Sequence, residues 1–239
     1  MPTHKPAPNW LTFDCYGTLI QWDEGLYEVA RQLLHNKKVE DLDPRTLLEV
    51  YERHEFRLEQ TPPYRSFREI AQMALEQTMD ELGLPVEQVD GEILTAAISG
   101  MPAFPEVPDV LRRLKAAGFR LCIISNTDDS IIAGNVGQLG NTIDRIITAE
   151  QAGAYKPSLA LFEHAYRELG VDSNETVHIC ASPHLDLAAA RDLGLRCIWV
   201  DRGSGRKPPP DYTPDATLPD LNGLPELFAQ FGWIAHSTA

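Results

Sequence analysis

The second half of the sequence alternates short apolar runs with helix-forming segments, and this alternation limits the fold more than any other feature. The predicted strands cover 119–124, 143–147, 176–180 and 195–200, and the predicted helices cover 107–117, 128–139, 158–169 and 185–193. Gly118, Gly170 and Gly194 follow three of these helices, where a helix commonly ends. Strands that alternate with helices of this length form a parallel sheet with helices on both faces. The sequence therefore predicts an α/β fold with a doubly wound parallel sheet.

An all-helical block interrupts this pattern after the first strand, which ends at Asp14. The residues from about 24 to 99 show helical signals only. Asp43-Pro44 is a typical helix start, and Ser66 with Glu69 forms a capping box at the start of a further helix. We therefore expect a core made of residues 1–20 and 101–239, with a helical cap formed by residues 21–100 inserted into it.

The C-terminal part contains a proline-rich stretch from Arg206 to Pro219, which we expect to form an ordered surface loop before a closing helix at 221–231. No apolar run reaches the length of about 18 residues that a membrane span needs. The first eight residues are polar and rich in proline, which is unlike a secretory signal. A cytoplasmic protein without membrane contact is expected.

The charge and the cysteine content argue against nucleic-acid binding and against thiol chemistry. The net charge of -14 repels a phosphate backbone and argues against a nucleic-acid partner. Four cysteines, at 15, 122, 180 and 197, lie far apart without a C-x-x-C pair, so we expect free and buried thiols. Cys15 has no nearby histidine in the sequence to activate it as a nucleophile.

Polar residues follow four of the predicted strands: Asp14 with Thr18, Ser125 with Asn126, Lys156, and Asp186. Each group has an ordinary structural explanation, such as a turn, a solvated cation or a helix cap. In a parallel sheet, however, these strand ends meet at one edge, where open α/β sheets bind ligands. Taken together, the groups predict one active-site crevice.

The order of these motifs resembles the haloacid dehalogenase superfamily, over residues 13 to about 202. Phe13-Asp14-Cys15-Tyr16-Gly17-Thr18-Leu19 looks like its first motif and is highly specific. Ile123-Ile124-Ser125-Asn126, Tyr155-Lys156-Pro157 and the segment 182–186 resemble the second, third and fourth motifs. The resemblance implies a Rossmann-like core with a helical cap inserted after the first motif.

Two positions separate the branches of this family. Phosphatases that resemble this chain carry an aspartate two residues after the nucleophile, as general acid and Mg²⁺ ligand, where this chain has Tyr16. A phenol, with a pKa of about 10, is a poor acid at neutral pH. Their fourth motif brings a further acid at the position of Ser182. Two carboxylates alone would hold Mg²⁺ poorly, so neither a metal nor another cofactor is expected.

Tyr16 is instead typical of the 2-haloacid dehalogenases, the type II branch. The resemblance implies that Asp14 attacks the carbon bearing the halogen of a short 2-haloacid and forms an ester. Lys156 would hold Asp14 ionised. By analogy, Thr18 and Ser125 would bind the nucleophile or the substrate carboxylate, Asn126 would face the halide, and Asp186 would position water or balance Lys156.

A cap arginine completes the halide site in such dehalogenases. The candidates are Arg53, Arg57, Arg65 and Arg68, with Arg53 and Arg57 predicted to bind substrate together with Tyr16, Asn126 and Ser182. The fourth motif departs from the common Ser-Ser-Asn-x-x-Asp form, since it reads Ala181-Ser182-Pro183-His184-Leu185-Asp186. This leaves His184 as a candidate general base, or as a solvent-facing residue at a helix start.

Two other functions remain open at this stage. One is a Mg²⁺-dependent phosphatase acting on a small phosphate ester, against which Tyr16 argues. The other is a non-catalytic member that keeps the fold as a binding module. A homodimer is an expectation from the resemblance alone.

Overall fold

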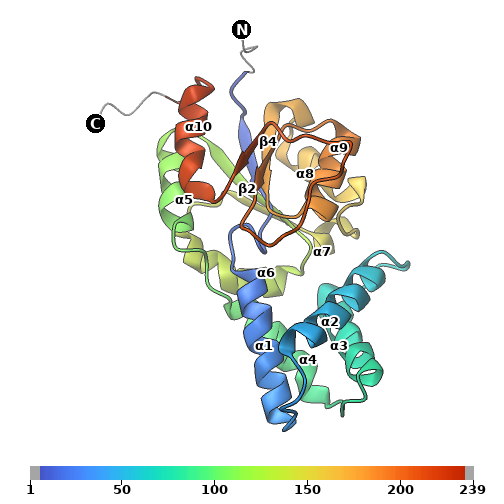
Figure 1. The fold of residues 1–239 in the computed structure, drawn as a ribbon. Coiled ribbons are helices and arrows are strands. Elements are labelled where there is room, and N and C mark those ends of the chain that lie inside the picture. Colours follow the sequence, from blue (N-terminus) through green and yellow to red (C-terminus); the bar gives the residue numbers. More distant parts are fainter. Residues whose placement is uncertain (1–5, 235–239) are drawn as a thin grey trace.

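The computed structural model describes residues 6–234 and contains a six-stranded parallel sheet with the strand order β3-β2-β1-β4-β5-β6 (Figure 1). The strands are β1 (Trp10–Phe13), β2 (Arg120–Ser125), β3 (Arg145–Thr148), β4 (Thr176–Cys180), β5 (Cys197–Val200) and β6 (Ala216–Leu218). β1 is central, and its Phe13 pairs with Ile123 of β2 and with Ile179 of β4. The α/β fold with a Rossmann-like parallel sheet is confirmed.

Helices cover both faces of the sheet, as a doubly wound fold requires. They are α5 (Val107–Ala116), α6 (Asp129–Val136), α7 (Ala149–Ala152), α8 (Leu159–Leu169), α9 (Ala188–Leu193) and α10 (Leu224–Gln230). Because side chains alternate along a strand, Leu11 and Phe13 pack with residues of α5 and α10, whereas Trp10 packs with residues of α8 and α9. The strands of the sheet's centre are therefore buried on both faces.

The helical insertion, residues 22–100, consists of α1 (Trp22–Asn36), α2 (Pro44–Glu59), α3 (Phe67–Glu81) and α4 (Gln88–Gly100). Asp43 caps α2 by accepting a hydrogen bond from Arg45 N at 2.9 Å, and Ser66 with Glu69 forms the expected capping box at α3. The four helices pack on one another below the sheet in Figure 1, beside the loops that follow the strands.

One loop of the sheet domain holds the start of α3. The Asp128 carboxylate, on the segment after β2, accepts hydrogen bonds from Phe67 N at 2.8 Å and Arg68 N at 2.9 Å. The first amides of a helix have no partner within the helix and carry partial positive charge, so a carboxylate there is stabilising. Asp128 is only 4% exposed, which makes this a buried link between the two parts of the molecule.

The structure differs from the sequence-based expectation in several places. β3 and β5 each begin two residues later than the predicted strands, at Arg145 and Cys197, and the predicted helix 185–193 begins with a π-helical turn, Pro183–Leu187. The stretch from Arg206 to Pro219 is not all loop, because Ala216–Leu218 pairs with β5 as an edge strand. An edge strand tolerates flanking prolines because one side needs no hydrogen bonds, and this is why the proline content hid it.

The described residues contain no helix that is long and apolar enough to cross a membrane. All four cysteines are buried and free of disulfide bonds, as the sequence predicted. Burial raises the pKa of the Cys15 thiol well above its usual range, so the thiol stays protonated and inert beside Asp14.

We expect Gly134→Ala to destabilise the protein. A Cβ atom at Gly134 of α6 would collide with the Ser99 side chain and carbonyl oxygen of α4, at a contact between the sheet domain and the helical insertion. The free energy of unfolding should fall by about 1–3 kcal/mol, the usual effect of overpacking. Gly137→Ala is the matched control, because nothing lies within 4 Å of the place that its new methyl group would take. Urea denaturation of both variants measures the difference, and equal losses would contradict the assigned contact.

Candidate active site

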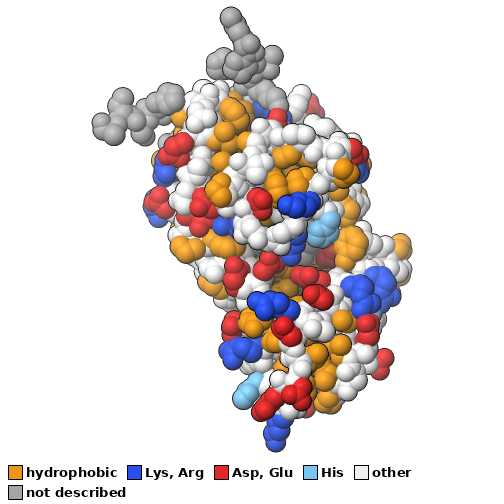
Figure 2. Space-filling model, in the orientation of Figure 1, with side chains coloured by type: hydrophobic (Ala, Val, Ile, Leu, Met, Phe, Trp, Pro, Cys, Tyr) orange, Lys and Arg blue, Asp and Glu red, His pale blue; other side chains and the backbone are white. Residues whose placement is uncertain are grey.

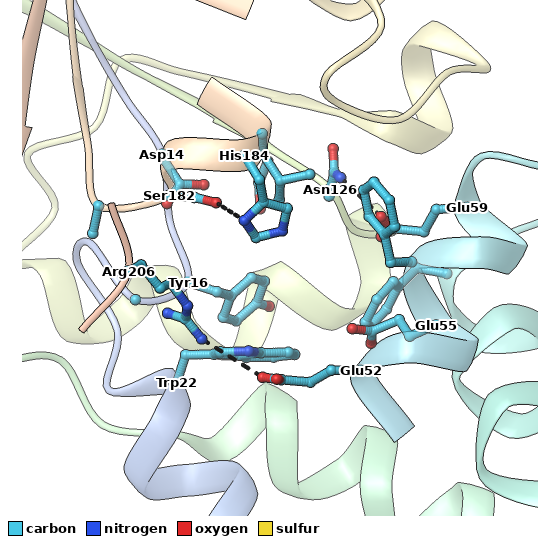
Figure 3. Close-up of a pocket in the computed structure, with 16 residues that line it drawn as sticks. Asp14, Tyr16, Trp22, Glu52, Glu55, Glu59, Asn126, Ser182, His184 and Arg206 are labelled. Carbon is cyan, nitrogen blue, oxygen red and sulfur yellow. Dashed lines mark hydrogen bonds and ion pairs between the residues drawn. The ribbon is translucent and has the colours of Figure 1, made fainter. Parts of the chain in front are cut away.

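A cavity of about 150 Å³ lies between the carboxyl ends of the strands and helix α2 (Figure 3). Its floor comes from the sheet domain and its opposite wall from the helical insertion. Figure 2 shows acidic and basic side chains gathered at the junction of these two parts. The lining residues include Asp14, Tyr16, Trp22, Glu52, Glu55, Phe56, Glu59, Phe67, Ser125, Asn126, Ser182, His184 and Arg206.

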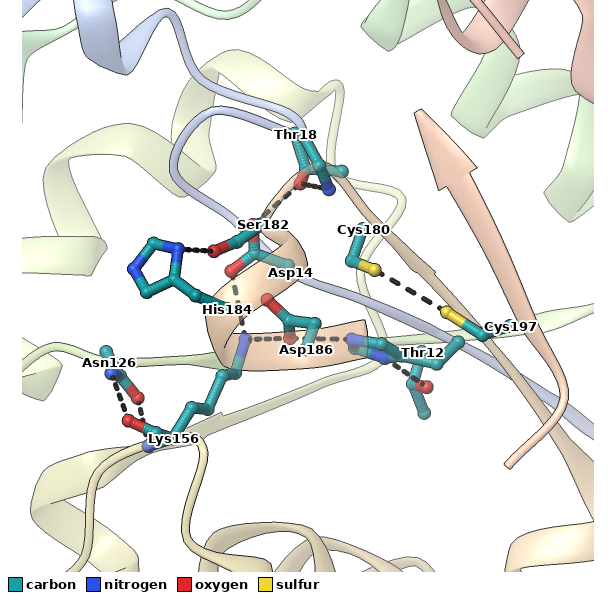
Figure 4. Close-up of polar contacts among 12 residues, drawn as sticks. Thr12, Asp14, Thr18, Asn126, Lys156, Cys180, Ser182, His184, Asp186 and Cys197 are labelled. Carbon is teal, nitrogen blue, oxygen red and sulfur yellow. Dashed lines mark hydrogen bonds and ion pairs between the residues drawn. The ribbon is translucent and has the colours of Figure 1, made fainter. Parts of the chain in front are cut away.

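Asp14 stands at the floor of the cavity, directly after β1, and both of its carboxylate oxygens are held. Oδ2 accepts a hydrogen bond from Thr18 Oγ1 at 2.6 Å, and Oδ1 accepts one from Lys156 Nζ at 2.9 Å (Figure 4). Thr18 Oγ1 in turn accepts a hydrogen bond from Ala181 N at 2.8 Å. The side chain of Asp14 therefore has a fixed orientation toward the cavity that it lines.

Lys156 joins Asp14 to Asp186 inside the protein. Its ammonium lies 2.7 Å from Asp186 Oδ1, and both Lys156 and Asp186 have 0% exposure. His178 of β4 extends this chain, with Nε2 at 2.9 Å from Asp186 Oδ1 and Nδ1 at 2.9 Å from Thr12 Oγ1. With both ring nitrogens occupied, His178 acts as a positioning residue for Asp186. The sequence analysis missed it, although a lone histidine inside an apolar strand was a visible signal.

The two carboxylates share one ammonium, and the pKa values of the three groups differ accordingly. Burial raises the pKa of Asp14, and Lys156 offsets this only in part. Burial alone would also raise the pKa of Asp186, but Lys156 and His178 hold it below its ordinary value. Burial alone would lower the pKa of Lys156, but the two carboxylates hold it above its ordinary value. Lys156 thus stays charged, and Asp14 is the less stabilised anion of the two.

Ser125 and Asn126 follow β2 and line the cavity beside Asp14. Asn126 Oδ1 accepts a hydrogen bond from Lys156 N at 2.7 Å, so Asn126 also fixes the backbone of the lysine loop. Ser125 Oγ is buried and has no hydrogen-bond partner within the described part of the chain. A buried hydroxyl without a partner is costly, so this one is available to a ligand.

Tyr16 does not offer an acid to the cavity. Its hydroxyl donates a hydrogen bond to Asn135 Oδ1 at 3.0 Å, and burial raises its pKa above the ordinary value for tyrosine. Its ring packs against Trp22, with the ring centroids 5.0 Å apart. Tyr16 therefore forms part of the cavity wall.

Ser182 and His184, from the π-helical turn after β4, also line the cavity. His184 Nδ1 lies 3.5 Å from Ser182 Oγ, and its ring packs edge-on against Phe56 of α2. The residue is exposed, as expected at a helix start, but partial desolvation and the nearby charge of Arg206 lower the pKa of its imidazole. Its imidazole is then neutral at neutral pH, the form a general base needs.

The cap arginines are placed differently from the sequence-based prediction. Arg53 pairs with Glu81 and Arg57 with Gln77, both on α3, and neither lines the cavity. The reason is helical periodicity, because residues four apart share a face and this face of α2 packs on α3. Assigning Arg53 and Arg57 to substrate binding is therefore corrected.

The other two candidates also point elsewhere. Arg65 donates hydrogen bonds to the carbonyl oxygens of Thr61 and Pro63, and Arg68 donates one to Thr95 of α4. The face of α2 that does line the cavity carries Glu52, Glu55 and Glu59 instead.

Arg206 is the arginine that reaches the cavity, from the loop after β5. Its guanidinium lies 3.0 Å from Asp23 of α1 and 3.6 Å from Glu52 of α2 (Figure 3). Sequence analysis placed this residue in a surface loop and assigned it no role. Its place after a strand end of a parallel sheet was the signal that could have found it.

Comparisons with known proteins identify the family of this chain. Residues 9–194 match the family model described as haloacid dehalogenase-like hydrolase. The chain belongs to the haloacid dehalogenase-like hydrolases. The (S)-2-haloacid dehalogenase of Pseudomonas sp. (strain YL) is 27% identical over 227 residues, covering 91% of this chain and 93% of that protein.

Two further relatives support the same assignment. Haloacetate dehalogenase H-2 of Moraxella sp. (strain B) is 29% identical over 168 residues, covering 70% of this chain and 75% of its own. The crystal structure of the L-2-haloacid dehalogenase RSc1362 superposes with a TM-score of 0.83 at 22% identity, over 94% of this chain and all of its own. At this identity, the structural likeness speaks for the fold.

The candidate active site of this haloacid dehalogenase-like hydrolase offers few free ligands for a metal. Asp14 uses both carboxylate oxygens in hydrogen bonds, and Asp186 Oδ2 is buried without a partner in the described structure. The only His/Cys/Asp/Glu group of metal-binding size among residues 6–234 is His178, Cys180 and Asp186. Both nitrogens of His178 are already bonded, so this group fits a metal poorly.

We expect the stability of the protein to fall as the pH rises from about 5 to about 8, and Glu55→Gln to reduce this fall. Burial raises the pKa of Glu55 to about 8 from a reference value of 4.5. The folded state then binds a proton that the unfolded state releases, so the contribution of Glu55 to stability is present below the unfolded pKa and is lost toward pH 8. Urea denaturation at several pH values measures this.

Glu163→Gln, at an exposed position of α8, is the control and should keep the slope of the unmodified protein. If Glu55→Gln leaves the slope unchanged as well, Glu55 does not hold a proton in the folded state.

Proposed function

We propose that this protein hydrolyses the carbon–halogen bond of short 2-haloacids through an ester formed on Asp14. The observation that carries the proposal is the state of Asp14, a carboxylate fixed at the floor of the cavity by Thr18 and Lys156. Two residues further on, where a leaving-group acid would stand, the hydroxyl of Tyr16 is occupied by Asn135. Halide leaves as a stable anion and needs no acid.

The first step is a displacement at carbon. An oxygen of Asp14 attacks the carbon that bears the halogen, the carbon–oxygen bond forms, and the halide leaves with the bonding electron pair. Asp14 must be ionised to attack. Because burial raises its pKa, it is a more reactive anion than a solvated carboxylate, and the ammonium of Lys156 keeps it oriented.

The second step is hydrolysis of the ester. Water attacks the carbonyl carbon of the Asp14 ester, the 2-hydroxyacid leaves, and the carboxylate is restored with one oxygen from water. His184 is neutral and lines the cavity, so we assign it the proton that the water loses. Asp186 is fully buried and does not line the cavity, so it would act through Lys156, whose ammonium it shares with Asp14.

The sheet domain would hold the substrate. Ser125 Oγ has no partner and would donate a hydrogen bond to the substrate carboxylate, while the amide of Asn126 would face the halide. Ser182 and the ring of Tyr16 would form the wall beside the substrate. The curated relatives named above as 2-haloacid and haloacetate dehalogenases support this substrate class. The helical insertion would act as the cap that excludes water.

We expect Asp14→Asn to abolish halide release from 2-chloropropionate, with a loss of more than roughly a thousandfold, because the nucleophile is removed. The unmodified protein, treated with chelator and quenched during turnover in water enriched in oxygen-18, should carry the label in the peptide that contains Asp14. Ion chromatography measures the halide and mass spectrometry the label.

Asp41→Asn, at an exposed position between α1 and α2, is the matched control and should keep full activity. Halide release without label in the Asp14 peptide would contradict the ester mechanism. Chelator-sensitive release of phosphate from a small phosphate ester, with no halide release, would select the Mg²⁺-dependent phosphatase. Binding without turnover would select a non-catalytic member.

A further inference from the structure

We propose that the substrate of this site carries a protonated amine in addition to its carboxylate, and that Glu55 and Glu59 of the helical insertion bind this amine. The proposal rests on the function proposed above and specifies its substrate class. Three features of the cavity support the proposal. They are its charge distribution, the aromatic side chains beside the two glutamates, and the unpartnered polar atom at its floor.

The α2 wall, the face of α2 that lines the cavity, carries three glutamates, and only one of them lies near a cation. Glu52 is matched, because the Arg206 guanidinium lies 3.6 Å away. Glu55 and Glu59 have only neutral partners: Tyr51 OH donates to Glu55 at 2.7 Å, and Asn126 Nδ2 donates to Glu59 at 3.3 Å. Neither of these half-buried carboxyl groups forms an ion pair, and an ammonium group of the substrate would supply the missing cation.

A plain 2-haloacid offers no cation to this wall. The one arginine that lines the cavity, Arg206, is already shared by Asp23 and Glu52. The ammonium of Lys156 is likewise shared by Asp14 and Asp186. No basic group of the cavity is therefore left to favour an anion at the α2 wall.

Aromatic side chains accompany the two glutamates. Trp22, Phe56 and Phe67 line the same cavity, and the ring of Trp22 lies near Glu52 and Glu55 in Figure 3. Carboxylates combined with the faces of aromatic rings are the usual means of binding an alkylammonium group. The same rings would also accept the carbon chain that joins the amine to the reacting carbon.

The floor of the cavity carries a hydrogen-bond donor that suits a different group. Ser125 Oγ, on a residue with 0% exposure, lines the cavity without a hydrogen-bond partner in the described chain. A hydroxyl there can donate to a carboxylate. The cavity thus has a donor beside the nucleophile and acceptors on the α2 wall, an arrangement that fits a zwitterion.

The pKa values of the two glutamates agree with a missing cation. Burial raises the pKa of Glu59 well above its ordinary value, and the neighbouring Glu55 adds to this rise. Both groups therefore bind a proton more readily than a solvated glutamate does. A bound ammonium would displace these protons, so binding should release protons to the buffer.

The test uses two substrates of nearly the same shape, 3-amino-2-chloropropionate and 2-chlorobutanoate, in which an ammonium replaces a methyl group. We expect kcat/KM of halide release to favour the amine by roughly tenfold or more in the unmodified protein. In the double variant Glu55→Gln/Glu59→Gln this preference should disappear. Rates without protein are subtracted, because the amine of 3-amino-2-chloropropionate can itself displace the chloride and form a three-membered ring.

Glu163→Gln is the control and should keep the preference of the unmodified protein. Halide release from both substrates, with equal rates or a preference for 2-chlorobutanoate, would overturn the amine proposal and leave the proposed function intact. Loss of the preference in Glu163→Gln would also overturn it.

Calorimetry with the two products separates the proposals if neither substrate releases halide. The dehalogenase function then fails, but 3-amino-2-hydroxypropionate should still bind more tightly than 2-hydroxybutanoate, with release of protons detected in buffers of different ionisation enthalpy. Equal affinities, or binding without proton release, would overturn the recognition of the amine by Glu55 and Glu59.

Discussion

The ammonium of Lys156, shared by Asp14 and Asp186 in the interior, is the interaction on which the rest of the site depends. A buried charge is tolerated only when it is paired, and here one cation serves two carboxylates. Three strand ends have to converge for this to happen, which the parallel sheet provides. The arrangement also makes the two carboxylates unequal, because His178 supports Asp186 whereas Asp14 stands at the cavity floor.

The parts of the site that belong to the sheet could be predicted from the sequence. Asp14, Ser125, Lys156 and Asp186 follow apolar runs, and a parallel sheet brings such positions to one edge whatever the details of packing. The capping signals at Asp43 and Ser66 likewise depend on local chemistry alone, and the structure has both. The short edge strand β6 was not predicted, because prolines surround it in the sequence.

The wall opposite the sheet could not be predicted in the same way. Arg53 and Glu52 are neighbours in sequence but point to different faces of α2, and only the packing of α2 against α3 decides which face meets the cavity. Arg206 depends on the course of a loop after β5, and no local pattern in a proline-rich stretch specifies this course. The arginines were predicted to line the cavity because of their residue type, whereas the orientation of α2 about its axis places the glutamates there.

The hydrogen bonds between Asp128 and the first amides of α3 have a consequence for access to the cavity. The segment that carries Asp128 also carries Ser125 and Asn126, so the loop that would contact the ligand is the loop that anchors the helical insertion. Moving the helical insertion away from the sheet would remove both hydrogen-bond donors from the buried Asp128 carboxylate. The energetic cost of opening would therefore be concentrated at this one contact. The amide hydrogens of Phe67 and Arg68 would therefore report opening, because they exchange with solvent only when their hydrogen bonds to Asp128 are broken.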